Sequence, residues 1–147
     1  MRRIYPPVYL LLGIIVGIGL HFLLPNGRFI PAPFNLLGIL LILLGLGMML
    51  WSSNRFSRSD TTIIPFQESS QLVQSGLFRF SRNPIYLGMA IILTGVAVIL
   101  GSIVPFLMVP LFMWIIQRNF IIHEEVMLEE TFGEDYRQYK KEVRRWL

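Results

Sequence analysis

The longest apolar run in the chain extends from Ile85 to Ile116 and contains 32 residues without a charged side chain. A helix needs about 20 apolar residues to cross the hydrocarbon core of a bilayer, so this run is too long for one span and fits two short ones. Gly101-Ser102 and Pro105 interrupt the run near its middle. We therefore expect a helical hairpin in a membrane, with its turn near Gly101-Ser102.

Two further apolar runs precede this hairpin. Val8 to Leu24 comprises seventeen residues with His21 as the only strongly polar one, and Phe34 to Trp51 comprises eighteen with only Asn35 polar. Each run is close to the length that spans a bilayer. The sequence thus predicts an all-α fold, an integral membrane bundle of four transmembrane helices, formed by one domain over residues 1–147.

The first run has an alternative interpretation as a cleaved signal peptide, because Arg2 and Arg3 precede it. A signal peptide is followed by a cleavage site with small residues, whereas Pro25-Asn26-Gly27-Arg28 follows this run. The flanks therefore favour a retained helix over a leader.

The distribution of positive charge predicts an orientation in the membrane. Of the thirteen Lys and Arg residues, only Arg28 lies in the first loop and none lies in the connection near Gly101. By the positive-inside rule, both termini and the long loop from Ser52 to Ser81 face the cytoplasm, and the cell (inner) membrane is the expected location. Since the basic residues flank apolar spans, we expect them to contact lipid headgroups and not nucleic acid.

The remaining segments are polar. The loop from Ser52 to Ser81 is long for so small a protein, and loops of this length are usually functional or disordered. His123 to Leu147 is rich in charge, with apolar residues at helical intervals, which predicts an amphipathic C-terminal helix or helix pair broken at Phe132-Gly133. The chain has no cysteine and only two histidines, far apart, so we expect neither a disulfide nor a metal site.

Two polar clusters should meet at the cytoplasmic side. One is the segment from Ser70 to Tyr86, and the other follows the hairpin and contains Arg118, His123, Glu124 and Glu125. A hairpin places Tyr86 and Arg118 at the same depth, so a pocket between the clusters would have a polar mouth and an apolar interior. Such a pocket suits a water-soluble cofactor and a lipophilic substrate. The alternative is that the arginines anchor the helices and the glutamates form a solvated first turn.

Two motifs carry a family resemblance. The first is Leu72-Val73-x-Ser75-Gly76-x-Phe78-x-x-x-Arg82-Asn83-Pro84-x-Tyr86-x-Gly88, and the second is Glu124-Glu125-x-x-Leu128 followed by Phe132-Gly133-Glu134-x-Tyr136-x-x-Tyr139-Lys140-Lys141-x-Val143. In this order, and separated by a helical hairpin, they resemble the membrane-embedded isoprenylcysteine carboxyl methyltransferases and the related phospholipid methyltransferases.

The resemblance implies an S-adenosylmethionine-dependent membrane methyltransferase that acts on a lipophilic acceptor in the bilayer. The residues that match the family's cofactor contacts are Ser70, Gln71, Leu72, Val73, Phe78, Asn83, Pro84, Ile85, Tyr86 and Glu124. No catalytic residue is identified, and Arg118 and Arg82 are candidates for positioning the substrate.

The chain departs from the family pattern at three positions. Asn83 replaces a histidine, Phe78 replaces a tyrosine, and Phe120 stands where the family has a substrate-binding arginine. These departures favour the alternative of a catalytically inactive small membrane protein with the same fold. A nicotinamide-dependent membrane reductase is a further alternative, although nothing in the sequence resembles a dinucleotide-binding glycine loop.

Overall fold

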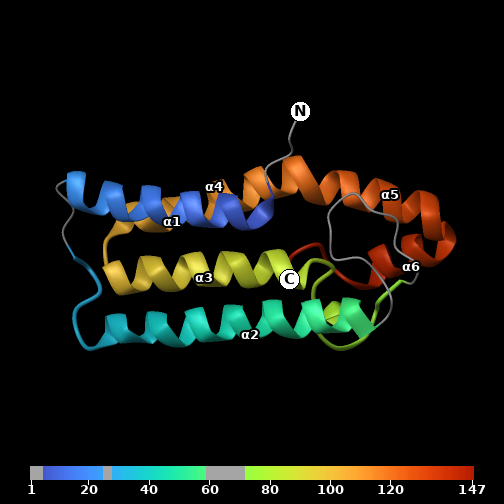
Figure 1. Ribbon diagram of the computed structural model, residues 1–147, viewed down its shortest axis with the longest axis horizontal. Coiled ribbons are helices and arrows are strands. Elements are labelled where there is room, and N and C mark those ends of the chain that lie inside the picture. Colours follow the sequence, from blue (N-terminus) through green and yellow to red (C-terminus); the bar gives the residue numbers. More distant parts are fainter. Residues whose placement is uncertain (1–4, 25–27, 59–71) are drawn as a thin grey trace.

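The computed structural model describes residues 5–24, 28–58 and 72–147, and within these it consists of helices joined by short connections (Figure 1). The elements in chain order are α1 (Pro6–Leu23), η1 (Phe34–Leu36), α2 (Leu37–Arg58), η2 (Gly76–Arg79), α3 (Pro84–Leu100), α4 (Ile103–Ile116), η3 (Gln117–Ile121), α5 (Ile122–Phe132) and α6 (Glu134–Glu142). The predicted cofactor contacts Ser70 and Gln71 lie outside the described residues.

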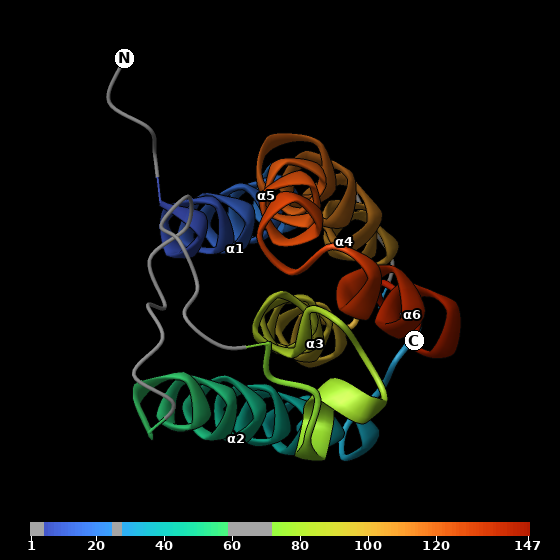
Figure 2. The same cartoon turned by 90° about the vertical axis from the view of Figure 1, so that its right-hand side faces the viewer.

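The helices α1 to α4 run in alternating directions along one long axis (Figure 1). Viewed along this axis, α3 lies in the middle, with α2 on one side and α1 and α4 on the other (Figure 2). The end of the bundle at which α3 begins is called the polar end here, and the end with the α3–α4 turn is called the turn end. The central place of α3 explains why most of its side chains are buried although it is as apolar as its neighbours.

Among the described residues, three helices are long and apolar enough to cross a membrane: Pro6–Leu23, Phe34–Arg55 and the continuous helix Ile103–Phe132 formed by α4, η3 and α5. Helix α3 is a shorter apolar helix of 17 residues. Large apolar side chains of α1 and α2 are exposed along both helices, as expected for surfaces that face lipid. The protein therefore has the architecture of an integral membrane protein.

The predicted hairpin is confirmed. Helix α3 ends at Leu100 and α4 begins at Ile103, with Gly101 in the left-handed conformation at φ +69°. The Gly101 carbonyl accepts hydrogen bonds from the backbone N–H groups of Phe29 and Ile30, at 2.8 and 3.3 Å. The connection between α1 and η1, which contains Phe29 and Ile30, is thereby fixed to the turn end.

One predicted boundary is wrong. Helix α2 does not end near Trp51 but continues to Arg58, so the first part of the predicted loop from Ser52 to Ser81 is helical. Ser52 is fully buried, and the Arg55 guanidinium lies 5.5 Å from the centre of the Trp51 ring, one turn earlier. Packing of this polar turn against the protein favours helix beyond the apolar run.

Candidate functional site

The site at the polar end begins with a contact between the two predicted clusters. The Tyr86 hydroxyl donates a hydrogen bond to Oε1 of Glu124 at 2.7 Å, across 38 residues of sequence. Pro84 is the first residue of α3, where its fixed φ suits a helix and no backbone donor is lost, and this places Tyr86 in the first turn. Tyr86 is buried, and Glu124 lies in the first turn of α5. The predicted proximity of the clusters is confirmed.

The helix that carries Glu124 contains a π-helical segment, η3, directly before α5. Segments of this kind insert an extra residue into a turn and are frequent at functional sites. Here Phe120 is buried, with its ring centre 6.4 Å from that of Tyr86 and 5.7 Å from that of Tyr9. Arg118, in contrast, is exposed. A buried aromatic ring therefore stands at position 120, and a role of Arg118 or Arg82 in positioning a substrate remains a prediction.

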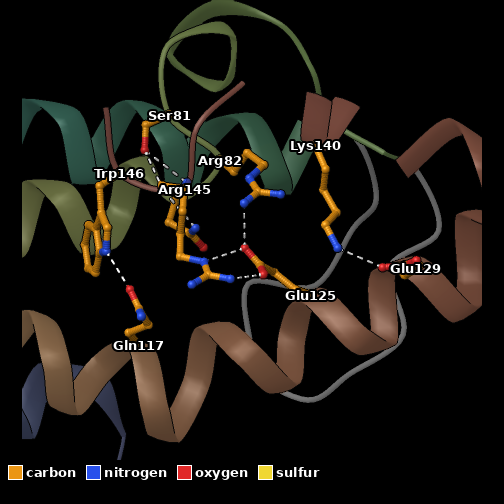
Figure 3. A network of polar contacts seen from close by, with 9 residues as sticks. Ser81, Arg82, Gln117, Glu125, Glu129, Lys140, Arg145 and Trp146 are labelled. Carbon is orange, nitrogen blue, oxygen red and sulfur yellow. Dashed lines mark hydrogen bonds and ion pairs between the residues drawn. The ribbon is translucent and has the colours of Figure 1, made fainter. Parts of the chain in front are cut away.

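Glu125 forms a second polar centre beside the first (Figure 3). Its Oε1 accepts from Arg82 Nη2 at 3.0 Å and from Arg145 Nε at 2.9 Å, and its Oε2 accepts from Arg145 Nη2 at 2.6 Å. The side chains of Arg82 and Glu125 are each only 9% exposed. Two cations thus face one carboxylate, and within the described part of the chain Nε and Nη1 of Arg82 are buried without a hydrogen-bond partner.

Residues 143–147 return across the start of α3 and are bonded to it. The backbone N–H of Arg82 donates to the Arg144 carbonyl at 3.0 Å. The Arg145 carbonyl accepts from Asn83 Nδ2 at 3.0 Å and from Ser81 Oγ at 3.3 Å (Figure 3). The side-chain amide of Asn83 therefore donates its hydrogen bond to the C-terminal segment.

The helix α6 anchors the segment that precedes α3. The Tyr139 hydroxyl donates to the backbone carbonyl of Phe78 at 2.6 Å, and both residues are buried. Burial raises the pKa of Tyr139 to about 12, which keeps its hydroxyl protonated at neutral pH. Tyr136, Tyr139 and Val143 form a small cluster against which Leu72 packs.

The predicted cofactor contacts within the described residues are arranged around this end of α3. Tyr86 and Glu124 are bonded to each other, whereas Leu72 and Asn83 contact the C-terminal part of the chain. The other members have the following environments: Val73 and Ile85 are half-buried, and Phe78 and Pro84 are buried. Their contacts with a cofactor remain predictions.

The sequence did not identify Arg145 and Trp146 as residues of the site. Arg145 was grouped with the basic residues expected at lipid headgroups, but its guanidinium points to Glu125 inside the protein. Trp146 donates from Nε1 to Gln117 Oε1 at 3.0 Å and packs against the core that contains Tyr86. The signal in the sequence was the Glu124-Glu125 pair itself, because two adjacent carboxylates on a helix point about 100° apart and require two separate partners.

The fold and this site define the class of the protein. It is a small helical membrane protein whose polar site lies at one end of the bundle. Residues 34–135 match the family model described as phospholipid methyltransferase. The chain belongs to this family, and the resemblance found in its motifs is confirmed.

Individual relatives agree with this assignment. The chain is 36% identical to the protein-S-isoprenylcysteine O-methyltransferase of Schizosaccharomyces pombe over 72 residues, which cover 49% of this chain and 30% of that protein. It is 26% identical to a probable protein-S-isoprenylcysteine O-methyltransferase of Oryza sativa over 108 residues, which cover 72% of this chain and 56% of the relative.

An uncharacterized protein of Haemophilus influenzae is 41% identical over 63 residues, which cover 43% of this chain and 100% of that protein. The chain therefore matches only part of the two named methyltransferases, 30% of the length of the one and 56% of the other. No solved structure shows significant similarity to the chain.

Proposed function

We propose that the protein is an S-adenosylmethionine-dependent methyltransferase of the membrane whose cofactor site is built around Tyr86 and Glu124. The observation that carries the proposal is the 2.7 Å hydrogen bond between these two side chains, one from each family motif, at the polar end of the bundle. Family membership supports the reaction class.

The chemistry of the available groups fits this cofactor. Within the described residues, Oε2 of Glu124 has no hydrogen-bond partner and can accept from an ammonium or a ribose hydroxyl. The unbonded Nε and Nη1 atoms of Arg82 are donors of the kind that a carboxylate requires. The ring of Tyr86 offers an aromatic face, which attracts cations.

S-adenosylmethionine supplies an already activated methyl group when it is bound. The residues of this chain therefore need to align the acceptor and exclude water, which requires no strong acid or base in the protein. The apolar surroundings of Tyr86, formed by Met89, Phe112, Ile116 and Phe120, are suited to exclude water and to accommodate lipophilic groups. We propose a lipophilic acceptor that enters from the bilayer and offers a carboxylate, an amine or a thiol.

The proposed arrangement has four membrane-spanning helices, with α3 as the short central one, in the cell (inner) membrane. The polar end and both termini face the cytoplasm in this arrangement, because nearly all basic residues flank that end. A cytoplasmic site would give a water-soluble cofactor direct access. The second candidate function, a catalytically inactive protein of the same fold, is favoured by Phe120, since a buried aromatic ring stands where the family has a cation.

Calorimetric titration of the purified protein in detergent with S-adenosylmethionine tests the cofactor site. We expect binding by the wild type and a loss of about tenfold in affinity for Tyr86→Phe, which removes one hydrogen bond to a charged group. Glu124→Ala should weaken binding further, because it removes the carboxylate itself. Absence of binding by the folded wild-type protein would contradict the proposal.

A further inference from the structure

The two adjacent glutamates of α5 serve different partners. Successive residues of an α-helix point about 100° apart, so Glu124 and Glu125 cannot face the same group. Glu124 is bonded to Tyr86, whereas both oxygens of Glu125 accept hydrogen bonds from arginines. Glu125 is buried, with 7% of its surface exposed, and its carboxylate binds Arg82 and Arg145.

The partners of Glu125 lie on segments that are distant in sequence. Arg82 directly precedes α3, Glu125 lies in α5, and Arg145 follows α6. Figure 3 shows the two guanidinium groups converging on one carboxylate between these segments. Two of these three segments also carry the Tyr86–Glu124 pair, because Tyr86 lies four residues after Arg82 and Glu124 directly precedes Glu125.

We propose that Glu125 is a positioning residue for the cofactor site, and that the C-terminal segment 143–147 is an integral part of that site through Arg145. In this role Glu125 makes no contact with the cofactor. It fixes the start of α3 against α5, so that Tyr86 and Glu124 are presented to the cofactor together. This inference rests on the proposed cofactor site.

The hydrogen bonds of the C-terminal segment support this role. Residues 144 and 145 accept bonds from Arg82, Asn83 and Ser81, which form the connection into α3. Trp146 packs against the apolar core that contains Tyr86, as Ile85 does. The segment is thus bonded to the connection that leads into α3 and packs on the core of Tyr86, so a displacement of Arg145 would disturb the start of α3.

Electrostatics makes the carboxylate necessary. Without the Glu125 charge, two guanidinium groups would face each other in a largely buried place, where like charges repel strongly. The segments that carry them would separate, and the distance between Tyr86 and Glu124 would no longer be fixed. Glu125→Gln keeps the shape of the side chain, removes this charge and replaces one of the two acceptor oxygens by a donor.

A second ion-pair cluster, which joins α5 to α6, provides control variants for this role. Glu129 of α5 binds Lys140 at 2.9 Å and Arg137 at 3.0 Å, both from α6, and these side chains are 34–56% exposed, in contrast to Arg82 and Glu125. Glu129→Gln and Lys140→Ala therefore remove exposed ion pairs between α5 and α6 and leave the ion pairs of Glu125 in place.

The test measures the dissociation constant of S-adenosylmethionine by calorimetry in detergent for variants whose helix content and thermal midpoint are recorded alongside. We expect Glu125→Gln and Arg145→Ala each to weaken binding about tenfold while the protein stays helical. The double variant should lose no more than the stronger single one, Arg145→Lys should recover part of the affinity, and both controls should bind as the wild type does.

The outcomes separate the two proposals. Wild-type affinity in Glu125→Gln and Arg145→Ala would overturn the positioning role and leave the proposed function intact. If Glu125→Gln does not fold, Arg145→Lys and Arg145→Ala decide the question in the same way. No binding by the wild type would overturn the proposed function, and the positioning role with it.

Discussion

At the polar end, the Trp51 ring lies against the backbone of Gly76. A Cβ atom built on Gly76 would overlap this ring, and Gly76 has a φ of +63° that other residues rarely adopt. The Trp51 indole of α2 therefore lies directly on the first residue of η2. This contact attaches the Ser75-Gly76 part of the first motif to α2.

Gly76→Ala should lower the free energy of unfolding by about 2 kcal/mol or more, because it combines backbone strain with overpacking. The measurement is denaturant-induced unfolding in mixed detergent micelles. Gly133→Ala is the matched control, since Gly133 also has a positive φ of +56° but nothing within 4 Å of its Cβ position. Equal effects of both substitutions would contradict a role of the Trp51 contact.

At the level of residues, the sequence predicted the part of the site that motifs encode. The meeting of Tyr86 with the Glu124 cluster followed from the hairpin, because two ends of a hairpin share one depth. The role of Arg145 did not follow, since a basic residue near the chain end resembles any other basic residue until the fold brings it to Glu125. Partners chosen by tertiary structure leave no local pattern.

At the level of elements, α2 and α3 pack closely against each other at glycine residues. Gly45 faces Gly88 and Gly38 faces Gly95, and a Cβ atom on Gly45 would lie 2.5 Å from the Gly88 carbonyl oxygen. Small residues allow such close backbone approach, which drives helix association in membranes where the hydrophobic effect is absent. Gly38 and Gly45 therefore lie on the face of α2 that packs against α3.

Gly45→Ala should destabilise the protein by about 1–3 kcal/mol, because the added methyl group meets backbone that can move only by separating the two helices. Unfolding in mixed detergent micelles measures this loss. Gly47→Ala, two residues along the same helix, has nothing within 4 Å of its Cβ position and should be neutral. If Gly47→Ala destabilises as much as Gly45→Ala, helix propensity or lipid contact explains the effect and the glycine contact does not.

The lengths of the elements were predictable where composition decides them. Proline before the apolar run and the Gly101 turn set the limits of α3 from local chemistry. The end of α2 was missed because the residues after Trp51 are polar, whereas the structure buries Ser52 against the rest of the protein and places Arg55 over Trp51 within the helix. Likewise, the break at Phe132-Gly133 was predicted, but the π-helical segment before α5 was not.

At the level of the whole molecule, the two ends of the bundle differ in character. At the turn end, a hydrogen bond joins His21 Nδ1 and Ser102 Oγ at 2.6 Å, and Asn35 Nδ2 donates to the Ile99 carbonyl at 3.3 Å, in addition to the bonds to Gly101. The polar end contains the Tyr86–Glu124 pair, the Glu125 ion pairs and the C-terminal segment. Within the described residues, the ion pairs that join separate segments around α3 thus lie at the polar end, where the proposed function places the cofactor site.

Transfer of a labelled methyl group tests this account most directly. Membranes that contain the wild-type protein are incubated with methyl-labelled S-adenosylmethionine and either phosphatidylethanolamine vesicles or a farnesylated cysteine derivative, and label is counted in the organic extract. We predict label in the extract for the wild type and Glu129→Gln, and at least tenfold less for Glu124→Ala. Equal label with the wild type and Glu124→Ala, or none above that of membranes without the protein, would contradict the account.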